Sequence, residues 1–139
     1  MTRRDFILFF VCEVLGVGFA LSLFHHLEDP RWAGVLAGSG FLGIGLLIIW
    51  KTWKWEGKWG LGCFWMAHVQ TWVITLPMIL SRISHWESPL SLTTIIGIPF
   101  STFHWVSEVF YLFLMLVTIG DFFRLKPKKA NESPFTAED

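Results

Sequence analysis

The chain has 139 residues, of which 53% are hydrophobic and only 16% are charged. Soluble domains carry about a quarter charged residues, so this composition excludes an ordinary soluble globule, and its apolar content excludes a disordered chain. The eleven basic and eleven acidic residues cancel, which leaves no net field to attract nucleic acid. The composition predicts an integral membrane protein that is surrounded by the lipid bilayer.

Four stretches of the sequence are long and apolar enough to cross a bilayer, which takes about 20 mostly apolar residues. They cover residues 6–24, 32–50, 59–80 and 103–123. The first three are joined by short connections, which force neighbouring helices to run antiparallel. The sequence predicts an all-α transmembrane domain over residues 1–125, with four antiparallel helices.

The segment between the third and fourth stretches is longer than the other connections. Ser88 and Pro89 resemble an N-cap followed by proline at the first helical position, and Gly97 and Pro99 resemble stop signals. This pattern predicts a short interfacial helix over residues 89–96 on the extracytoplasmic side. From residue 126 the chain is polar and charged, so we expect residues 126–139 to be a disordered cytoplasmic tail.

The distribution of Lys and Arg predicts the orientation, because cytoplasmic loops carry an excess of positive charge. One side of the predicted bundle receives only Arg31 and Arg82. The other side receives Arg3, Arg4, Lys51, Lys54, Lys58, Arg124, Lys126, Lys128 and Lys129. We therefore expect both termini to be cytoplasmic, in what we take to be a bacterial inner membrane.

Small residues recur at four-residue spacing in the first two stretches. Gly34 and Gly38 form a GxxxG pair, and Gly16 and Ala20 repeat the spacing. Small residues on one stripe let helix backbones approach closely. They indicate either packing inside the bundle or a face for another subunit.

Ionisable residues at membrane depth are costly and normally face the bundle interior with a partner. Glu13, His68 and Glu108 lie inside predicted spans, and His104 lies one helical turn before Glu108. Glu13 and His68 are roughly level, about 10 and 13 Å from the cytoplasmic edge, so direct pairing is expected to be within reach. Two polar helix stripes facing each other would complete this core, and they include Thr71 and Tyr111.

Several functions are compatible with this core. The leading hypothesis is a non-enzymatic component of a membrane assembly, formed with its own copies or with other subunits, in which the polar core fixes helix packing. The runner-up is a proton or cation conductor that uses the ladder Glu13, His68, Glu108, His104.

Cofactor sites are weaker alternatives. His68 and His104 differ by roughly 13 Å in depth and cannot hold one haem between them, which leaves a haem on His68 alone. A metal site near the outer surface would use His25, His26, His104 and Glu108. The sequence holds no HExxH motif and no phosphate loop, which disfavours an enzyme.

Overall fold

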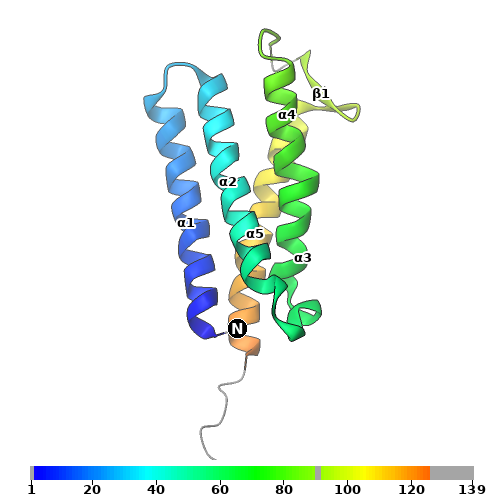
Figure 1. Ribbon diagram of the computed structural model, residues 1–139. Helices are drawn as coiled ribbons and strands as arrows, with labels where there is room; N and C mark the ends of the chain where they lie inside the picture. Colours follow the sequence, from blue (N-terminus) through cyan, green and yellow to red (C-terminus); the bar gives the residue numbers. More distant parts are fainter. Residues whose placement is uncertain (1, 90–91, 126–139) are drawn as a thin grey trace, which may run out of the picture.

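The computed structural model describes residues 2–89 and 92–125. Four helices that are long and apolar enough to span a membrane lie in it (Figure 1). They are α1 (Arg3–His26), α2 (Pro30–Trp53), the composite helix Gly62–Ser84, and α5 (Phe100–Arg124). The predicted number of spans is confirmed, and the predicted tail over residues 126–139 lies outside the described residues.

The first two spans begin at local capping signals. The backbone N–H of Thr2 donates to Asp5 Oδ2 at 2.7 Å before α1. Asp29 Oδ1 accepts the backbone N–H of Arg31 at 2.8 Å, and Pro30 occupies the first turn of α2. A carboxylate satisfies free backbone N–H groups at a helix start, where proline needs no hydrogen bond.

The third span follows a 3₁₀ turn (η1, Glu56–Gly60) and consists of three segments. These are α3 (Gly62–His68), the π-helix η2 (Val69–Thr75) and α4 (Leu76–Ser84). Pro77 has no N–H and crowds the carbonyl four residues earlier. The wider π-helical turn directly before it takes up this irregularity, and π-helical turns are frequent at functional sites.

The predicted helix over residues 89–96 is wrong for its second half, whereas Leu92 lies in a 3₁₀ turn whose N–H donates to the carbonyl of Pro89 at 3.0 Å. Instead, β1 (Thr94–Ile95) and β2 (Ile98–Pro99) pair as a two-stranded antiparallel hairpin. The β-branched run from Thr93 to Ile96 favours extended backbone over helix. Ile96 and Gly97 turn the chain with φ angles of 53° and 78°, and positive φ at both central residues characterises a type I′ hairpin turn.

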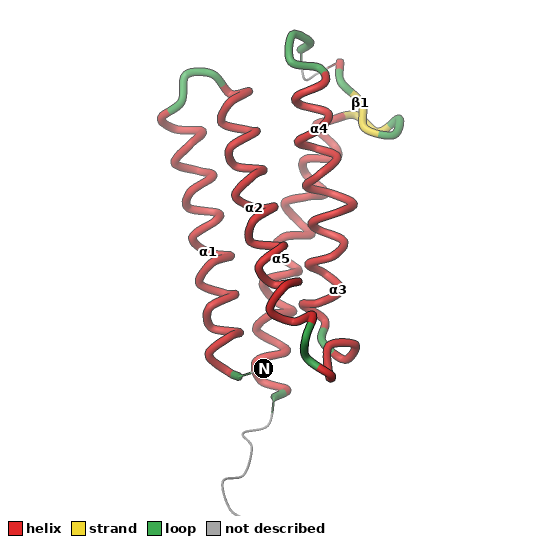
Figure 2. The backbone as a smooth tube through the Cα atoms, viewed as in Figure 1, coloured by secondary structure: helices red, strands yellow, loops and turns green. Residues whose placement is uncertain are grey.

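The apolar core lies in the half of the bundle that contains the N-terminus. It includes Phe6 and Phe9 of α1, Ile48 of α2, Phe64 of α3 and Leu114 of α5. The start of α1 and the end of α5 lie at this same end, where the Arg3 guanidinium donates to the carbonyl of Leu125 at 3.4 Å (Figure 1). The hairpin lies at the opposite end (Figure 2).

Candidate functional site

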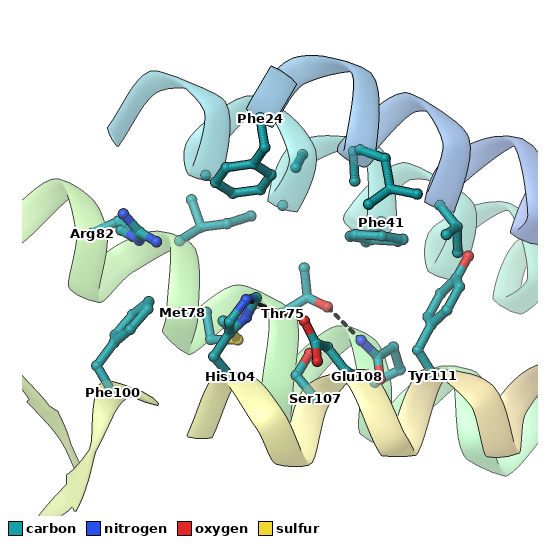
Figure 3. Close-up of a pocket in the computed structure, with 18 of the residues that line it drawn as sticks. Phe24, Phe41, Thr75, Met78, Arg82, Phe100, His104, Ser107, Glu108 and Tyr111 are labelled. Atoms are coloured by element: carbon teal, nitrogen blue, oxygen red, sulfur yellow. Dashed lines mark hydrogen bonds and ion pairs between the residues drawn. The ribbon is translucent and has the colours of Figure 1, made fainter. Parts of the chain in front are cut away.

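A cavity of about 410 Å³ lies between the helices, in the half of the bundle farther from the N-terminus. Its volume falls within the range of ligand pockets, roughly 300 to 1,000 Å³. Side chains from α1, α2, η2, α4 and α5 line it (Figure 3). The lining residues are Val17, Ala20, Leu21, Phe24, Gly34, Ala37, Gly38, Phe41, Gln70, Thr75, Met78, Ile79, Arg82, Phe100, His104, Ser107, Glu108, Tyr111 and Leu112.

Most of the cavity wall is apolar and aromatic. Phe24 and Phe41 project into it from one side, Met78 from α4, and Phe100 from the start of α5 (Figure 3). Leu112 continues the apolar surface on α5. Such a wall can accommodate an apolar molecule or chain, as the walls of most ligand pockets do.

Arg82 places a guanidinium group in this apolar wall. Its Cζ lies 4.7 Å from the centroid of the Phe100 ring. On the other side, a Cβ on Gly34 would lie only 3.0 Å from the same Cζ. The missing side chain of Gly34 thus makes room for the guanidinium group, whose Nη1 is buried with no hydrogen-bond partner among the described residues.

The π-helical turn contributes two further polar side chains. Gln70 is 2% exposed, and its Nε2 donates to Thr75 Oγ1 at 3.1 Å, shown as a dashed line in Figure 3. These residues are five apart, a separation at which the π-helix forms its own hydrogen bonds. Gln70 Oε1 is buried and has no hydrogen-bond partner in the described part of the chain.

His104 and Glu108 point into the cavity from α5 (Figure 3). His104 Nε2 lies 3.4 Å from Glu108 Oε1, one helical turn away. Of the four residues in the predicted ladder, these two come together. Glu108 has its partner on its own helix, and no hydrogen bond or ion pair joins it to Glu13 or His68 within the described ranges.

Tyr111 forms the floor of the cavity. Its hydroxyl donates to the backbone carbonyl of Glu13 at 3.2 Å, and its ring lies edge-on to Phe41 with centroids 4.7 Å apart. The Glu13 side chain is fully buried, and its Oε1 accepts the Thr118 hydroxyl at 2.8 Å. These bonds join α1 to α5 directly above the apolar core.

His68 lies away from both Glu13 and the cavity. Its Nδ1 is 2.9 Å from the carbonyl of Phe64, and its ring packs against Phe64 and Trp53. Glu13 contacts Thr118, whereas His68 contacts Phe64 and Trp53, and no hydrogen bond or ion pair joins the two side chains within the described ranges. Thr71 is fully buried, and its hydroxyl lies so close to Gly45 that a Cβ on Gly45 would collide with it. Thr71 therefore contributes to the close packing of η2 against α2.

The predicted metal ligands do not gather. His25 and His26 stack on each other at the end of α1, and His26 Nδ1 lies 2.9 Å from the carbonyl of Ser22. In the ranges that the structure describes, no three His, Cys, Asp or Glu side chains come together to hold a metal ion. The candidate centre from His25, His26, His104 and Glu108 therefore does not form.

The small residues face the inside of the bundle. A Cβ on Gly38 would lie 2.8 Å from Ile79 Cγ1, and one on Gly16 would lie 3.3 Å from the Tyr111 hydroxyl. Gly34 faces Arg82, and Ala20 lines the cavity. Of the two alternatives that the spacing left open, these four residues fit packing inside the bundle.

A buried carboxylate of α5 also caps α3. Asp121 is 3% exposed, and its Oδ2 accepts the backbone N–H of Cys63 at 2.8 Å. A negative charge at a helix N-terminus satisfies an otherwise free N–H group and interacts favourably with the helix dipole. This bond links residues 58 positions apart and closes the N-terminal end of the bundle.

Arg82 and Gln70, which line the cavity, and Asp121, which caps α3 at the other end of the bundle, have no role in the sequence-based prediction. The available signal for Arg82 was its spacing from Thr75 and Met78, which places all three on one helix face. Asp121 gave no such signal, because its partner is a backbone group far away in the sequence.

Neither protein-family models nor curated proteins nor solved structures gave a match to this chain. The geometry of the site is therefore the basis for a functional proposal.

Proposed function

We propose that this chain is a non-enzymatic integral membrane protein that binds a small amphipathic molecule in the cavity between its helices. The observation that carries the proposal is the combination of an apolar wall with a few buried polar groups in a space of about 410 Å³. Ligand sites in helix bundles have this character, with apolar lining for affinity and polar groups for orientation.

In this proposal the four helices cross the membrane antiparallel, with both termini in the cytoplasm of a bacterial cell. The excess of Lys and Arg in the connections near the N-terminal end supports this orientation. The cavity would then lie in the outer half of the bilayer, and the core around Phe9 and Phe64 would lie in the inner half.

Binding is favoured over conduction because the cavity has a closed floor. Tyr111, which forms this floor, is 5% exposed. Below it lie four apolar side chains that are each at most 2% exposed: Phe6, Phe9, Phe64 and Leu114. An ion or proton path needs polar groups or water along its length. Among the described residues, no hydrogen bond or ion pair links the buried Glu13 and Thr118 pair to Glu108 above it or to Asp121 below it. His68 does not join Glu13 to the cavity either.

Assembly with copies of this chain or with other membrane subunits stays a prediction from the sequence. The Gly34 and Gly38 pair that suggested a subunit face packs against Arg82 and Ile79 instead. A bound haem on His68 is likewise less well supported, since Phe64 and Trp53 pack against this ring.

The test is photolabelling of the protein in proteoliposomes with dodecanol that carries a diazirine, followed by peptide mapping. We expect adducts on cavity residues such as Phe24 and Met78. Ala20→Phe should abolish them by filling the cavity. The matched control is Gly18→Phe, which adds the same bulk to α1 where a Cβ meets nothing within 4 Å. Adducts confined to outward-facing residues and unchanged by Ala20→Phe would contradict the proposal.

A further inference from the structure

Arg82 defines the chemistry of the ligand at one end of the cavity. A buried charge without a partner is strongly unfavourable, and proteins normally pair such groups. Arg82 is half-buried, makes no ion pair within residues 2–89 and 92–125, and has its Nη1 atom buried without a hydrogen bond. The guanidinium group is held between Phe100 and Gly34. It is therefore preorganised to bind a planar anion, such as a carboxylate, through two hydrogen bonds.

The other charged groups of the cavity do not satisfy Arg82. The Glu108 carboxylate lies 3.4 Å from the His104 ring of its own helix. Glu13 is directed to Thr118 beneath the floor. The cavity therefore presents one cation that lacks a counter-ion among the described residues, in a wall that is otherwise mainly apolar.

The opposite end of the cavity offers a neutral polar group. Gln70 is 98% buried and belongs to the π-helical turn, and its amide oxygen lacks a hydrogen-bond partner among residues 2–89 and 92–125. Between this amide and Arg82 lie Met78 and the aromatic rings of Phe24 and Phe41. A ligand that complements this order has a negatively charged head and an apolar body.

The volume of the cavity matches a ligand with a single short chain. At roughly 30 Å³ for each water molecule in the liquid, a cavity of about 410 Å³ corresponds to about 14 molecules of water. Laurate has about this number of non-hydrogen atoms. A phospholipid with two full acyl chains is several times larger.

We propose that the cavity binds a single-chain anionic amphiphile, such as a fatty-acid carboxylate, with its head on Arg82 and its chain among the aromatic residues. This inference rests on the proposed function, because it names the chemical class of the molecule bound in the same cavity. It adds that the charge of the head, and not the chain alone, determines binding.

The experiment is calorimetric titration of the protein in lipid nanodiscs, with empty nanodiscs as the blank. The probes are laurate, dodecanol, dodecyltrimethylammonium and acetate. We expect laurate to bind at least tenfold more tightly than dodecanol, and the cation and acetate to bind much more weakly. Charge-assisted hydrogen bonds have a strength that corresponds to a difference of about ten- to a hundredfold.

Variants separate the head from the chain. Arg82→Gln should reduce laurate affinity by ten- to a hundredfold, to the level of dodecanol, and Arg82→Lys should fall between. The matched control is Arg31→Gln, which removes a cation from the same end of the bundle but outside the cavity lining. Without ligand, Arg82→Gln should be at least as stable as the wild type, because it removes a half-buried charge that has no ion-pair partner among the described residues.

The outcomes distinguish the two levels of the proposal. Equal binding of laurate and dodecanol, unaffected by Arg82→Gln, would overturn the anionic head but leave the binding function standing. Binding of acetate as tightly as laurate would overturn the amphiphile. Failure of every probe to bind would overturn the proposed function itself.

Discussion

Removal of the Asp121 carboxylate should separate the end of α5 from the start of α3. Its Oδ2 accepts the Cys63 N–H at 2.8 Å in a site that is 3% exposed. A hydrogen bond to a charged group contributes about 1.5–3 kcal/mol, and loss of an N-cap costs about 0.5–2 kcal/mol. These estimates describe the same contact, so we expect Asp121→Ala to lower the free energy of unfolding by about 2–3 kcal/mol. Asp121→Asn keeps an acceptor and should lose about 1 kcal/mol.

The assay is unfolding of the purified protein by titration with sodium dodecyl sulfate, followed by the fluorescence of its nine tryptophans. Asp29→Ala is the matched control, since Asp29 caps α2 at the same 2.8 Å but is half exposed. We expect the control to lose about 1 kcal/mol or less. If Asp121→Ala cost no more than Asp29→Ala, the buried cap would not hold the two helices together, and the reasoning would be refuted.

Three further predictions concern packing, the buried acid and conduction. Gly38→Val should lower the free energy of unfolding by about 1–3 kcal/mol, because the new side chain collides with Ile79. The control Gly18→Val lies on an open face and should change this free energy by less than about 0.5 kcal/mol. Equal effects of the two substitutions would contradict the inward orientation of Gly38. Glu13→Gln keeps an acceptor for its neighbouring hydroxyl and should stay within about 1 kcal/mol of the wild type in the same titration. Proteoliposomes should show no proton flux above empty vesicles in a pH-dye assay, and Glu108→Gln should change nothing; a flux that this substitution removes would restore the conduction hypothesis.

The spans could be predicted from the sequence because hydropathy reports what each segment contacts. The hairpin could not, because Ser88-Pro89 resembles a helix start while the residues after it prefer extended backbone. The helix signals and the β-branched run compete within a few residues. The chain forms the hairpin, with positive φ angles at its two turn residues Ile96 and Gly97.

The site was predicted only in part because sequence gives the depth of a side chain but not its direction around the bundle. The sequence predicts a similar depth for Glu13 and His68, yet one faces Thr118 and the other faces Trp53. The contact between His104 and Glu108 follows from the helical repeat alone, since both lie on one helix one turn apart. Arg82 was counted as a loop charge, and its placement beside Phe100 depends on contacts between different helices.

Whether the cavity binds an anionic amphiphile is tested most sharply by a structure of the protein in lipid with bromine-labelled laurate, in which anomalous scattering locates the bromine. We expect bromine inside the bundle near Phe41 and Tyr111, with the carboxylate on Arg82. Bromine found only on the outer surface of the helices, with the space between α1 and α5 filled by side chains, would contradict it.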